Sequence, residues 1–410
     1  MGAPGASLSD RFRPPGAGRL AAWIAAELDG GVSILGIPDQ LVFRPRPVHS
    51  FTLEVHGHRL ETPVGTAAGP HTQLASGIVA AWLCGARVIE LKTVQTLDEI
   101  AVAKPCIDMA DEGYNTEWSQ ELRVEASFAE YLTAWVLIHA LHARLGFPGP
   151  GPGVLFDVSV GYDLEGLKRP TMRWYLEHIA DAGDELERCR TEVGRHLPEA
   201  LEVEIPARLA DSATLSTLHG CPPEEIGAIV EHLTGHWGLH TAVKLNPTLL
   251  GLDDARAILT DLGWRHLEPD PEAFASDLPY PEALDLLLAL RADGARRGLE
   301  VGAKLCNTLP VSNRRPMLPD TEGTAYLSGR PLHAVAVALA HRLTEDSAGG
   351  IPISFAGGAD VDTTPELLAG GLRPVTLCSD LLRPGGLLRL GHVLAAVDSA
   401  LDEAGASSLD

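Results

Sequence analysis

One cysteine stands in a stretch that could carry acid–base chemistry. Cys221 follows His219 and Gly220 and precedes Pro222, ahead of a helix-like run at residues 224–233. Prolines are well tolerated at the first positions of a helix, because the N–H groups there have no partner within the helix. A thiol with an ordinary pKa of about 8.5 can hold a proton near neutral pH, so Cys221 is a candidate proton donor or acceptor. A cysteine that only packs in the core is the alternative.

Two lysines end apolar runs that read as β-strands. Lys92 follows Ile-Glu-Leu, and Lys244 follows Ala-Val. Lysine is rarely fully buried unless it is paired, so both amines are candidate functional groups. The alternative is that the two side chains extend along the barrel wall to the solvent rim.

These residues need a scaffold that brings distant parts of the chain together. Apolar runs that read as strands alternate with helical patterns from residue 63 onward. The expected strands are residues 64–69, 87–93, 154–160, 213–218, 241–246, 301–307, 351–356 and 375–378. Eight strands that alternate with helices predict a TIM (β/α)8 barrel, an α/β fold whose active site lies at the carboxyl ends of the strands. A doubly wound sheet would need a G-x-G-x-x-G after its first strand, which residues 65–71 do not contain.

The N-terminal part precedes this alternating pattern. Residues 20–28 have helical spacing, and residues 51–55 and 58–62 alternate around His56-Gly57, which predicts a β-hairpin. We therefore expect an N-terminal extension over residues 1–62 and a catalytic barrel over residues 63–410.

In such a barrel the informative residues lie at and just past the strand ends. Here they are Ala67, Ala68, Gly69, Lys92, Thr93, Gly161, Cys221, Lys244, Asn246, Asn307, Thr308, Gly357, Gly358, Cys378 and Ser379. The Gly357-Gly358 pair and Ser379 follow the seventh and eighth strands, where these barrels commonly hold a phosphate on backbone N–H groups and a helix N-terminus.

Composition excludes several classes of function. The net charge of −23 argues against nucleic acid or an anionic membrane as the main partner. None of the six cysteines forms a C-x-x-C pair, so neither an iron–sulfur cluster nor a structural zinc site is supported, and scattered thiols suit a reducing cytoplasm. No run approaches the ~18 apolar residues of a membrane span. Residues 2–9 lack the basic start and apolar core of a signal peptide.

Short motifs in a fixed order carry a family resemblance. They are Ala67-Ala68-Gly69, Lys92-Thr93, Asn115-Thr116-Glu117, Gly220-Cys221-Pro222, Val243-Lys244-Leu245, Cys306-Asn307-Thr308, Leu327-Ser328-Gly329, Gly357-Gly358 and Cys378-Ser379. With them the chain resembles the FMN-dependent dihydroorotate dehydrogenase-like barrels over about residues 63–401. It looks most similar to the flavin domain of dihydropyrimidine dehydrogenase and to the N-terminal barrel of proteins described as selenate reductase subunits.

The resemblance implies a role for each motif around FMN. The isoalloxazine ring would approach the backbone at Ala67, Ala68 and Gly69. Lys92, beside Thr93, and Lys244 would lie near the pyrimidine edge of the flavin, where positive charge stabilises the reduced anion. Asn307 and Thr308 would hydrogen-bond flavin or substrate. The ribityl phosphate would be held by Ser328, Gly329, Gly357, Gly358, Cys378 and Ser379.

The resemblance also implies the chemistry. Asn115 and Glu117 match an Asn-x-Glu that faces substrate in the pyrimidine reductase, although a turn residue and an exposed charge are the alternatives. Asn246 would face substrate as well. The implied reaction reduces or oxidises an activated C=C bond of a cyclic amide, either pyrimidine- or purine-like. Hydride would come from flavin N5 and the proton from Cys221.

The chain departs from the family at the catalytic loop. The family usually has Asn three residues before the cysteine, where this chain has Leu218. His219 is a substitute ligand, a proton partner for Cys221, or a histidine bonded to backbone. Residues 183–206 and 264–280 look like insertions and leave the substrate open.

Partners and alternative functions follow from what the sequence lacks. Nicotinamide and iron–sulfur modules of multidomain relatives are not recognisable, so electrons would come from a separate donor protein or domain, a diffusible donor or a second substrate. A homodimer is one assembly left open. Two other functions remain: a scaffold subunit of a larger reductase, with or without FMN, and a TIM-barrel lyase with a Schiff base at Lys92 or Lys244.

Overall fold

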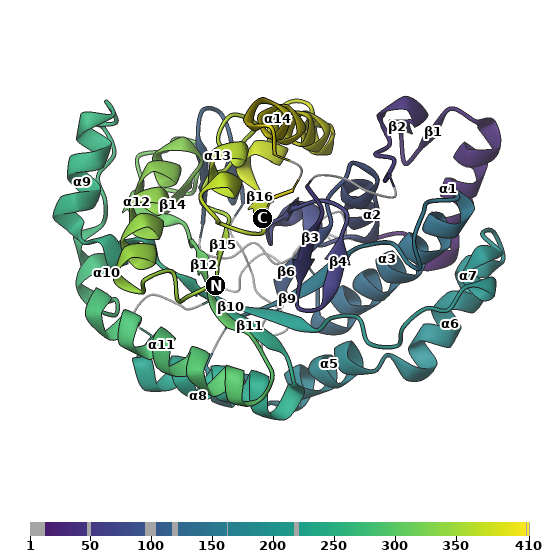
Figure 1. The fold of residues 1–410 in the computed structure, drawn as a ribbon, viewed down its shortest axis with the longest axis horizontal. Helices are drawn as coiled ribbons and strands as arrows, with labels where there is room; N and C mark the ends of the chain where they lie inside the picture. Colours follow the sequence, from purple (N-terminus) through teal and green to yellow (C-terminus); the bar gives the residue numbers. More distant parts are fainter. Residues whose placement is uncertain are drawn as a thin grey trace, which may run out of the picture.

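The computed structural model describes residues 13–46, 51–94, 104–116, 122–161, 163–216, 221–406 and 408–409. Eight parallel strands close into a barrel in the order β10-β11-β12-β15-β16-β5-β6-β9, and Figure 1 shows them at the centre of the helices. The strands are β5 (Val64–Thr66), β6 (Val88–Val94), β9 (Leu155–Gly161), β10 (Ser212–Ser216), β11 (His240–Leu245), β12 (Val301–Leu305), β15 (Ile353–Phe355) and β16 (Val375–Leu377). They are the eight strands expected from the sequence, so the TIM-barrel prediction is confirmed.

Several strands end earlier than the sequence pattern predicted. β5 ends at Thr66 and β12 at Leu305, where the apolar runs had suggested residues 69 and 307. The difference places Ala67 to Gly69 and Asn307 just beyond the strands, although the N–H groups of Ala67 and Asn307 still donate to the Leu377 and Leu245 carbonyls of the neighbouring strands, each at 2.9 Å. The barrel closes through β5 and β16, with Val64 beside Val375.

Helices surround the barrel. They include α2 (Ala75–Leu83), α3 (Val124–Arg144), α5 (Pro170–Ala180), α8 (Pro223–Trp237), α9 (Leu252–Asp261), α11 (Tyr280–Arg296), α12 (Arg330–Asp346), α13 (Thr364–Ala369) and α14 (Arg389–Ala404). The sequence interpretation placed no helix at α3, which contacts α2, α5 and α6 (Gly183–Gly194) and is buried around most of its circumference. A helix without a polar face has no amphipathic period to reveal it. Within the described ranges, no helix is both long and apolar enough to cross a bilayer.

The N-terminal segment packs on the side and on the amino end of the barrel. Helix α1 (Ala17–Gly30) lies against α6, which starts the segment that had looked like an insertion, and is followed by the short strands β1 (Ser33–Ile34) and β2 (Ile37–Pro38). Strands β3 (Leu53–Val55) and β4 (His58–Leu60) form a hairpin. Leu60 packs with Val88 and Leu155, which begin β6 and β9, so the hairpin covers the amino ends of these strands.

A second sheet covers the opposite, carboxyl end. Four short strands pair antiparallel in the order β13-β14-β8-β7, and we call them the cap sheet: β7 (Ile107–Asp108), β8 (Gly113–Asn115), β13 (Leu309–Ser312) and β14 (Thr324–Ser328). The first two follow β6 and the last two follow β12. None was expected from the sequence, because strands this short leave almost no alternating pattern.

The barrel interior contains a buried ion pair between Glu90 on β6 and Lys304 on β12, with exposed side-chain fractions of 1% and 3%. The Thr376 hydroxyl donates to Glu90 Oε1 at 2.5 Å and accepts from Lys304 Nζ at 3.1 Å. Burial alone would raise the pKa of Glu90, but Lys304 and Lys244 outweigh burial and hold that pKa below its usual value. The backbone N–H of Ala68 donates to Glu90 Oε2 at 3.3 Å, so the pair is tied to the loop after β5.

The hairpin turn makes stability sensitive to acid. His56 stacks on His240 with ring centroids 4.1 Å apart, and burial lowers its pKa to about 3. An unfolded histidine has a pKa near 6.5, so the unfolded state binds the extra proton first and stability falls as pH drops from about 6.5 towards 3. Asparagine tolerates the φ of +51° found at residue 56. In His56→Asn we therefore expect the free energy of unfolding to fall less steeply with decreasing pH, by up to ~1.4 kcal/mol per pH unit. Urea unfolding at pH 7 and pH 5 gives the change in the free energy of unfolding for the wild type and for His56→Asn. An equal loss in both proteins between these two pH values would contradict the assignment.

Candidate active site

A cavity of about 180 Å³ lies between the carboxyl ends of the barrel strands and the cap sheet. Residues at the strand ends line the cavity on the barrel side, and residues of β7, β8 and β14 line it on the side of the cap sheet. Eleven residues predicted from the sequence meet in it: Ala67, Ala68, Gly69, Lys92, Asn115, Lys244, Asn307, Thr308, Ser328, Cys378 and Ser379. Residues from seven separate stretches of the chain therefore converge on one cavity.

Other predicted residues lie elsewhere. The Thr93 hydroxyl shares a hydrogen bond of 2.8 Å with Ser159 Oγ and does not line the cavity. Cys221 and Asn246 line a small neighbouring cavity of about 30 Å³. Glu117 and His219 lie outside the residues that the structure describes.

Glycines allow close approach at two points of the cavity wall. A Cβ atom at Gly69 would lie 2.9 Å from Cys378 Sγ and equally close to the His71 ring. A Cβ atom at Gly113 would lie 2.3 Å from the Ser328 hydroxyl. Any larger residue would have to displace these neighbours, so glycine at both positions lets the segments of the cavity wall pack closely.

The two lysines lie at the same end of the cavity. Burial lowers the pKa of Lys92 to about 8; the Cys378 thiol acts against this shift and the Lys244 amine acts with it. An electron-rich or anionic ligand beside Lys92 would favour the charged form of this amine, which burial disfavours. Burial also raises the pKa of Cys378 to about 11 despite both lysines, so this thiol stays protonated at neutral pH.

Cys221 stands just before α8, with Pro222 as the residue that precedes the helix. Its side chain is partly exposed, and burial, Glu225 and Asp163 together raise the pKa of the thiol to about 11. A protonated thiol at neutral pH suits a proton donor and does not suit a thiolate nucleophile.

Within the described ranges, no three His, Cys, Asp or Glu side chains are grouped as metal ligands.

A chain of hydrogen bonds joins the two cavities. Asn307 Nδ2 donates to Asn246 Oδ1 at 2.7 Å, and Asn246 Nδ2 donates to Asp277 Oδ2 at 3.1 Å. The Ser216 hydroxyl donates to Asn307 Oδ1 at 3.3 Å. Asp277 and Ser216 were missed by sequence reasoning: Asp277 follows α10 (Pro271–Ser276) inside the apparent insertion, and nothing in its spacing marks it.

The predicted phosphate residues are only partly assembled around the cavity. Ser379 Oγ donates to Ser328 Oγ at 2.7 Å, and both serines line the cavity. Gly329, Gly357 and Gly358 do not line it, because Gly358 packs directly on the Gly329 carbonyl.

The N-terminus of α12 binds a carboxylate of the protein itself. The carboxylate of Glu112 accepts the backbone N–H of Arg330 at 3.2 Å and the Arg330 guanidinium at 2.7 Å. Arg383 adds a third bond to this carboxylate, at 3.3 Å. Sequence reasoning missed Glu112, whose carboxylate occupies the N-terminus of α12 directly after Ser328 and Gly329.

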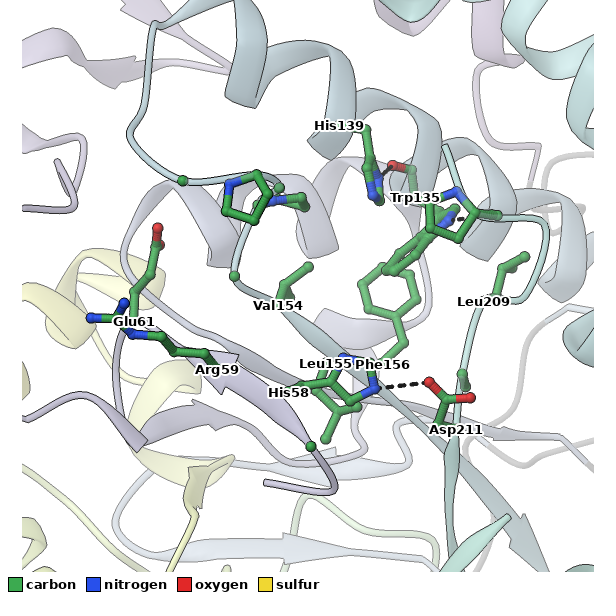
Figure 2. Close-up of a pocket in the computed structure, with 18 of the residues that line it drawn as sticks. His58, Arg59, Glu61, Trp135, His139, Val154, Leu155, Phe156, Leu209 and Asp211 are labelled. Atoms are coloured by element: carbon green, nitrogen blue, oxygen red, sulfur yellow. Dashed lines mark hydrogen bonds and ion pairs between the residues drawn. The ribbon is translucent and has the colours of Figure 1, made fainter. Parts of the chain in front are cut away.

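A larger cavity lies at the other end of the barrel. Its volume is about 580 Å³, and Figure 2 shows His58, Asp211, Trp135 and His139 among its walls. His58 Nε2 lies 2.8 Å from Asp211 Oδ2 there. None of the predicted site residues lines this larger cavity.

Comparison with known proteins places the chain in a family. The model for "Oxidoreductase YgfK, N-terminal TIM-barrel domain" matches residues 35–409. The YgfK proteins of Escherichia coli K12 and Escherichia coli O157:H7 are each 40% identical over an alignment of 412 positions, which covers 96% of this chain and 40% of theirs. The chain thus spans about two fifths of the length of these curated relatives.

Solved structures share the fold at low sequence identity. The ligand-free DHODH of Eimeria tenella is 17% identical, with a TM-score of 0.50 and 96% of each chain covered. The same enzyme in complex with ferulenol is 16% identical, with a TM-score of 0.55, and the match covers 98% of this chain and 95% of that one. The expected dihydroorotate dehydrogenase-like barrel is confirmed at the level of fold, and by the extent of the family match the chain belongs to the family of the oxidoreductase YgfK N-terminal TIM-barrel domain.

Proposed function

We propose that this domain is an FMN-dependent oxidoreductase that reduces or oxidises an activated C=C bond of a cyclic amide with a pyrimidine- or purine-like ring. The observation that carries the proposal is the convergence of the two lysines, Asn307 and the serines Ser328 and Ser379 on one cavity at the catalytic end of the barrel. The family's oxidoreductase name and the fold shared with a DHODH support it.

The residues present fit FMN. The Lys92 and Lys244 amines would hold the pyrimidine edge of the flavin, since Lys92 gains charge beside an electron-rich group. The open backbone at Gly69 would face the ring, and the Ser328 and Ser379 hydroxyls would hold the phosphate. When bound, FMN supplies hydride exchange at N5. The chain itself supplies the proton, which Cys221 holds on Sγ at neutral pH.

Identification of the bound cofactor tests the proposal. The purified domain is denatured, and the released small molecules are separated by chromatography and compared with FMN. We expect a yellow protein that releases FMN in up to equimolar amount. A colourless protein that takes up no added FMN would overturn the proposal and favour the scaffold function.

Loss of one lysine should weaken the cofactor site. Lys244→Ala removes a positive charge from the cavity, and a hydrogen bond to a charged group contributes about 1.5–3 kcal/mol, so the Kd for FMN should rise roughly 10- to 100-fold. The midpoint potential of bound FMN should also fall, because the reduced anion loses a stabilising charge. Fluorescence titration of the apoprotein measures the Kd. Lys168→Ala, at an exposed lysine paired with Glu165, is the matched control; an unchanged Kd and potential in Lys244→Ala would contradict the assignment.

The same proposal requires an electron donor. We propose a separate protein, a further domain of a longer polypeptide, or a diffusible reductant in this role, since the family relatives are more than twice as long as this chain. Anaerobic reduction of the bound flavin by candidate donors, followed by absorbance, distinguishes them.

A further inference from the structure

The larger cavity at the amino end of the barrel, which we call the amino-end cavity, has the size and the wall of a small-molecule site. Its volume of about 580 Å³ falls within the roughly 300–1,000 Å³ that ligand pockets usually have. The β3–β4 hairpin, α3, the loop before β9 and residues 206–211 contribute to its wall. Much of this wall is apolar, with the side chains of Trp135, Val154, Leu155, Phe156 and Leu209. An apolar molecule bound there would be shielded from water.

Aromatic rings form one side of the amino-end cavity. The Trp135 and Phe156 rings lie with their centroids 5.0 Å apart at an angle of 61°, and the Trp135 and His139 rings lie 4.4 Å apart at 65°. In Figure 2 the side chains of Trp135 and His139 project from α3 towards Val154 and Phe156. Tilted rings at such distances are an arrangement that aromatic groups prefer, so a further aromatic ring in the cavity can pack on them in the same way.

Several polar groups of this wall are satisfied within the protein. Trp135 Nε1 donates to the Pro206 carbonyl at 3.0 Å, and Trp82 Nε1 donates to the Pro152 carbonyl at 3.0 Å. The prolines that line the cavity have no N–H group. These groups therefore need no ligand to complete their hydrogen bonds.

The arginines and carboxylates of the wall also have partners. They are Arg46, Arg59, Glu61, Arg208 and Asp211. Asp211 Oδ1 accepts from Arg208 Nε at 2.5 Å, and Asp211 Oδ2 lies 2.8 Å from His58 Nε2. Glu61 accepts from the buried Arg87 at 2.5 Å. The wall therefore does not require a charged ligand.

His139 differs from these groups. Its Nδ1 lies 2.9 Å from the Trp135 carbonyl, which only accepts, so Nδ1 is assigned the hydrogen. Burial lowers the pKa of His139 to about 4, so at neutral pH the ring is neutral and its Nε2 is an unprotonated acceptor. The residue is 8% exposed, and among the described residues no group donates to this nitrogen. A buried acceptor without a donor is costly, so a ligand that donates to His139 from the cavity would be stabilised.

A second histidine with the same local sequence makes the contrast clear. His178 on α5 also follows a tryptophan by four residues, and its Nδ1 lies 2.7 Å from the Trp174 carbonyl. Its Nε2, however, lies 3.8 Å from Glu185 Oε2, and the residue does not line the cavity. The second ring nitrogen thus has a polar neighbour within the protein in α5, whereas in α3 it is left to the cavity.

We propose that the amino-end cavity is a second ligand site, which takes a flat, uncharged aromatic molecule that donates an O–H or N–H to His139 Nε2. The aromatic side of the wall packs on the ring of the ligand, and His139 fixes its orientation. The site lies at the opposite end of the barrel from the proposed active site, so the inference does not depend on the proposed function.

Calorimetric titration of the purified protein with matched probes tests the inference. 2-Naphthol and indole carry a donor, and 2-methoxynaphthalene and 1-methylindole are the same rings with the donor methylated. The cavity has room for the added methyl group, so the pairs differ mainly in the hydrogen bond. In the wild type, at least one donor probe should bind about tenfold more tightly than its methylated form, the effect of one hydrogen bond. Equal binding within both pairs, or no binding of either donor probe, would overturn the proposal.

One variant and a matched control assign the effect to His139. His139→Phe keeps an aromatic ring but has no acceptor, so the preference for the donor probes should be lost while the methylated probes bind as before. His178→Phe removes a histidine with the same helix bond outside the cavity and should match the wild type. Circular dichroism and the unfolding midpoint check that both variants fold. A donor preference retained in His139→Phe would refute the assignment, and the wild-type comparison decides the proposal if that variant does not fold.

The titration and the cofactor experiment fail independently, because calorimetry with these probes reports binding whether or not a flavin is present. A protein that releases FMN but shows no donor preference would keep the proposed function and overturn this inference. A protein without FMN that prefers the donor probes, and loses this preference in His139→Phe, would do the opposite.

Discussion

Cys221→Ala is expected to slow substrate turnover by about 10²–10⁴-fold, the usual effect of a lost general acid, while the domain stays folded and keeps its cofactor. The thiol is protonated at neutral pH, because burial raises its pKa to about 11, so it is poised to donate. It is only partly buried, and alanine in its place leaves little cavity. Steady-state turnover of the best cyclic amide substrate, with flavin content measured in the same samples, gives the comparison.

Two further variants separate this mechanism from its rival. Cys221→Ser should be intermediate in rate or shifted in its pH profile, because a hydroxyl releases its proton less readily. If His219 is the acid and Cys221 only packs, His219→Ala should abolish turnover and Cys221→Ala should retain it. Wild-type turnover in Cys221→Ala would end the proposed role of the thiol.

Lys304→Met should cost roughly 3–5 kcal/mol of unfolding free energy, the typical effect of removing one partner of a buried ion pair. The variant leaves the Glu90 carboxylate inside the barrel without its cation, although Thr376 still donates to it. Glu90 also accepts the Ala68 N–H, so the loop that lines the cavity should loosen and cofactor affinity should fall. Guanidinium unfolding, read from the midpoint and slope, measures the free energy.

The paired variant is the control for this prediction. Glu90→Gln combined with Lys304→Met removes both charges. The amide oxygen can still accept the Ala68 N–H and the amide NH2 can donate to the Thr376 hydroxyl, so most of the lost stability should return. Lys168→Met breaks an exposed pair and should change stability by less than about 1 kcal/mol. A double variant no more stable than Lys304→Met would show that the charge on Glu90 is not the source of the loss.

The barrel was predictable from sequence because each of its strands is a run of apolar residues set between helical patterns. The strand-end rule then pointed to Lys92, Lys244 and Asn307, and the structure places all three around one cavity. Lys304 could have been found in the same way, since it follows Val-Gly-Ala in β12 much as Lys244 follows Ala-Val in β11.

The remaining parts depend on contacts that no local pattern records. Helix α3 is apolar on nearly all sides, so its period is hidden. Glu112 reaches the start of α12 across more than 200 residues of sequence, and a lone glutamate in a loop gives no sign of this. Asp277 is likewise defined by its partners Asn246 and Thr248, and its neighbours in the chain reveal nothing of them.

The cap sheet has a consequence for how the domain is made. Its strands β8 and β14 lie on segments about 200 residues apart, and the Ser328 hydroxyl donates to the Gly113 carbonyl across 215 positions. Contacts of such separation form slowly, because a long loop must close before they contribute. A chain still on the ribosome that has emerged only as far as residue 320 contains six of the eight barrel strands and the β7–β8 pair, but it lacks β14, which joins that pair to β13. The wall above the cavity is therefore completed only after residue 328 has emerged, and any ligand that needs both β8 and β14 can be retained only after that point.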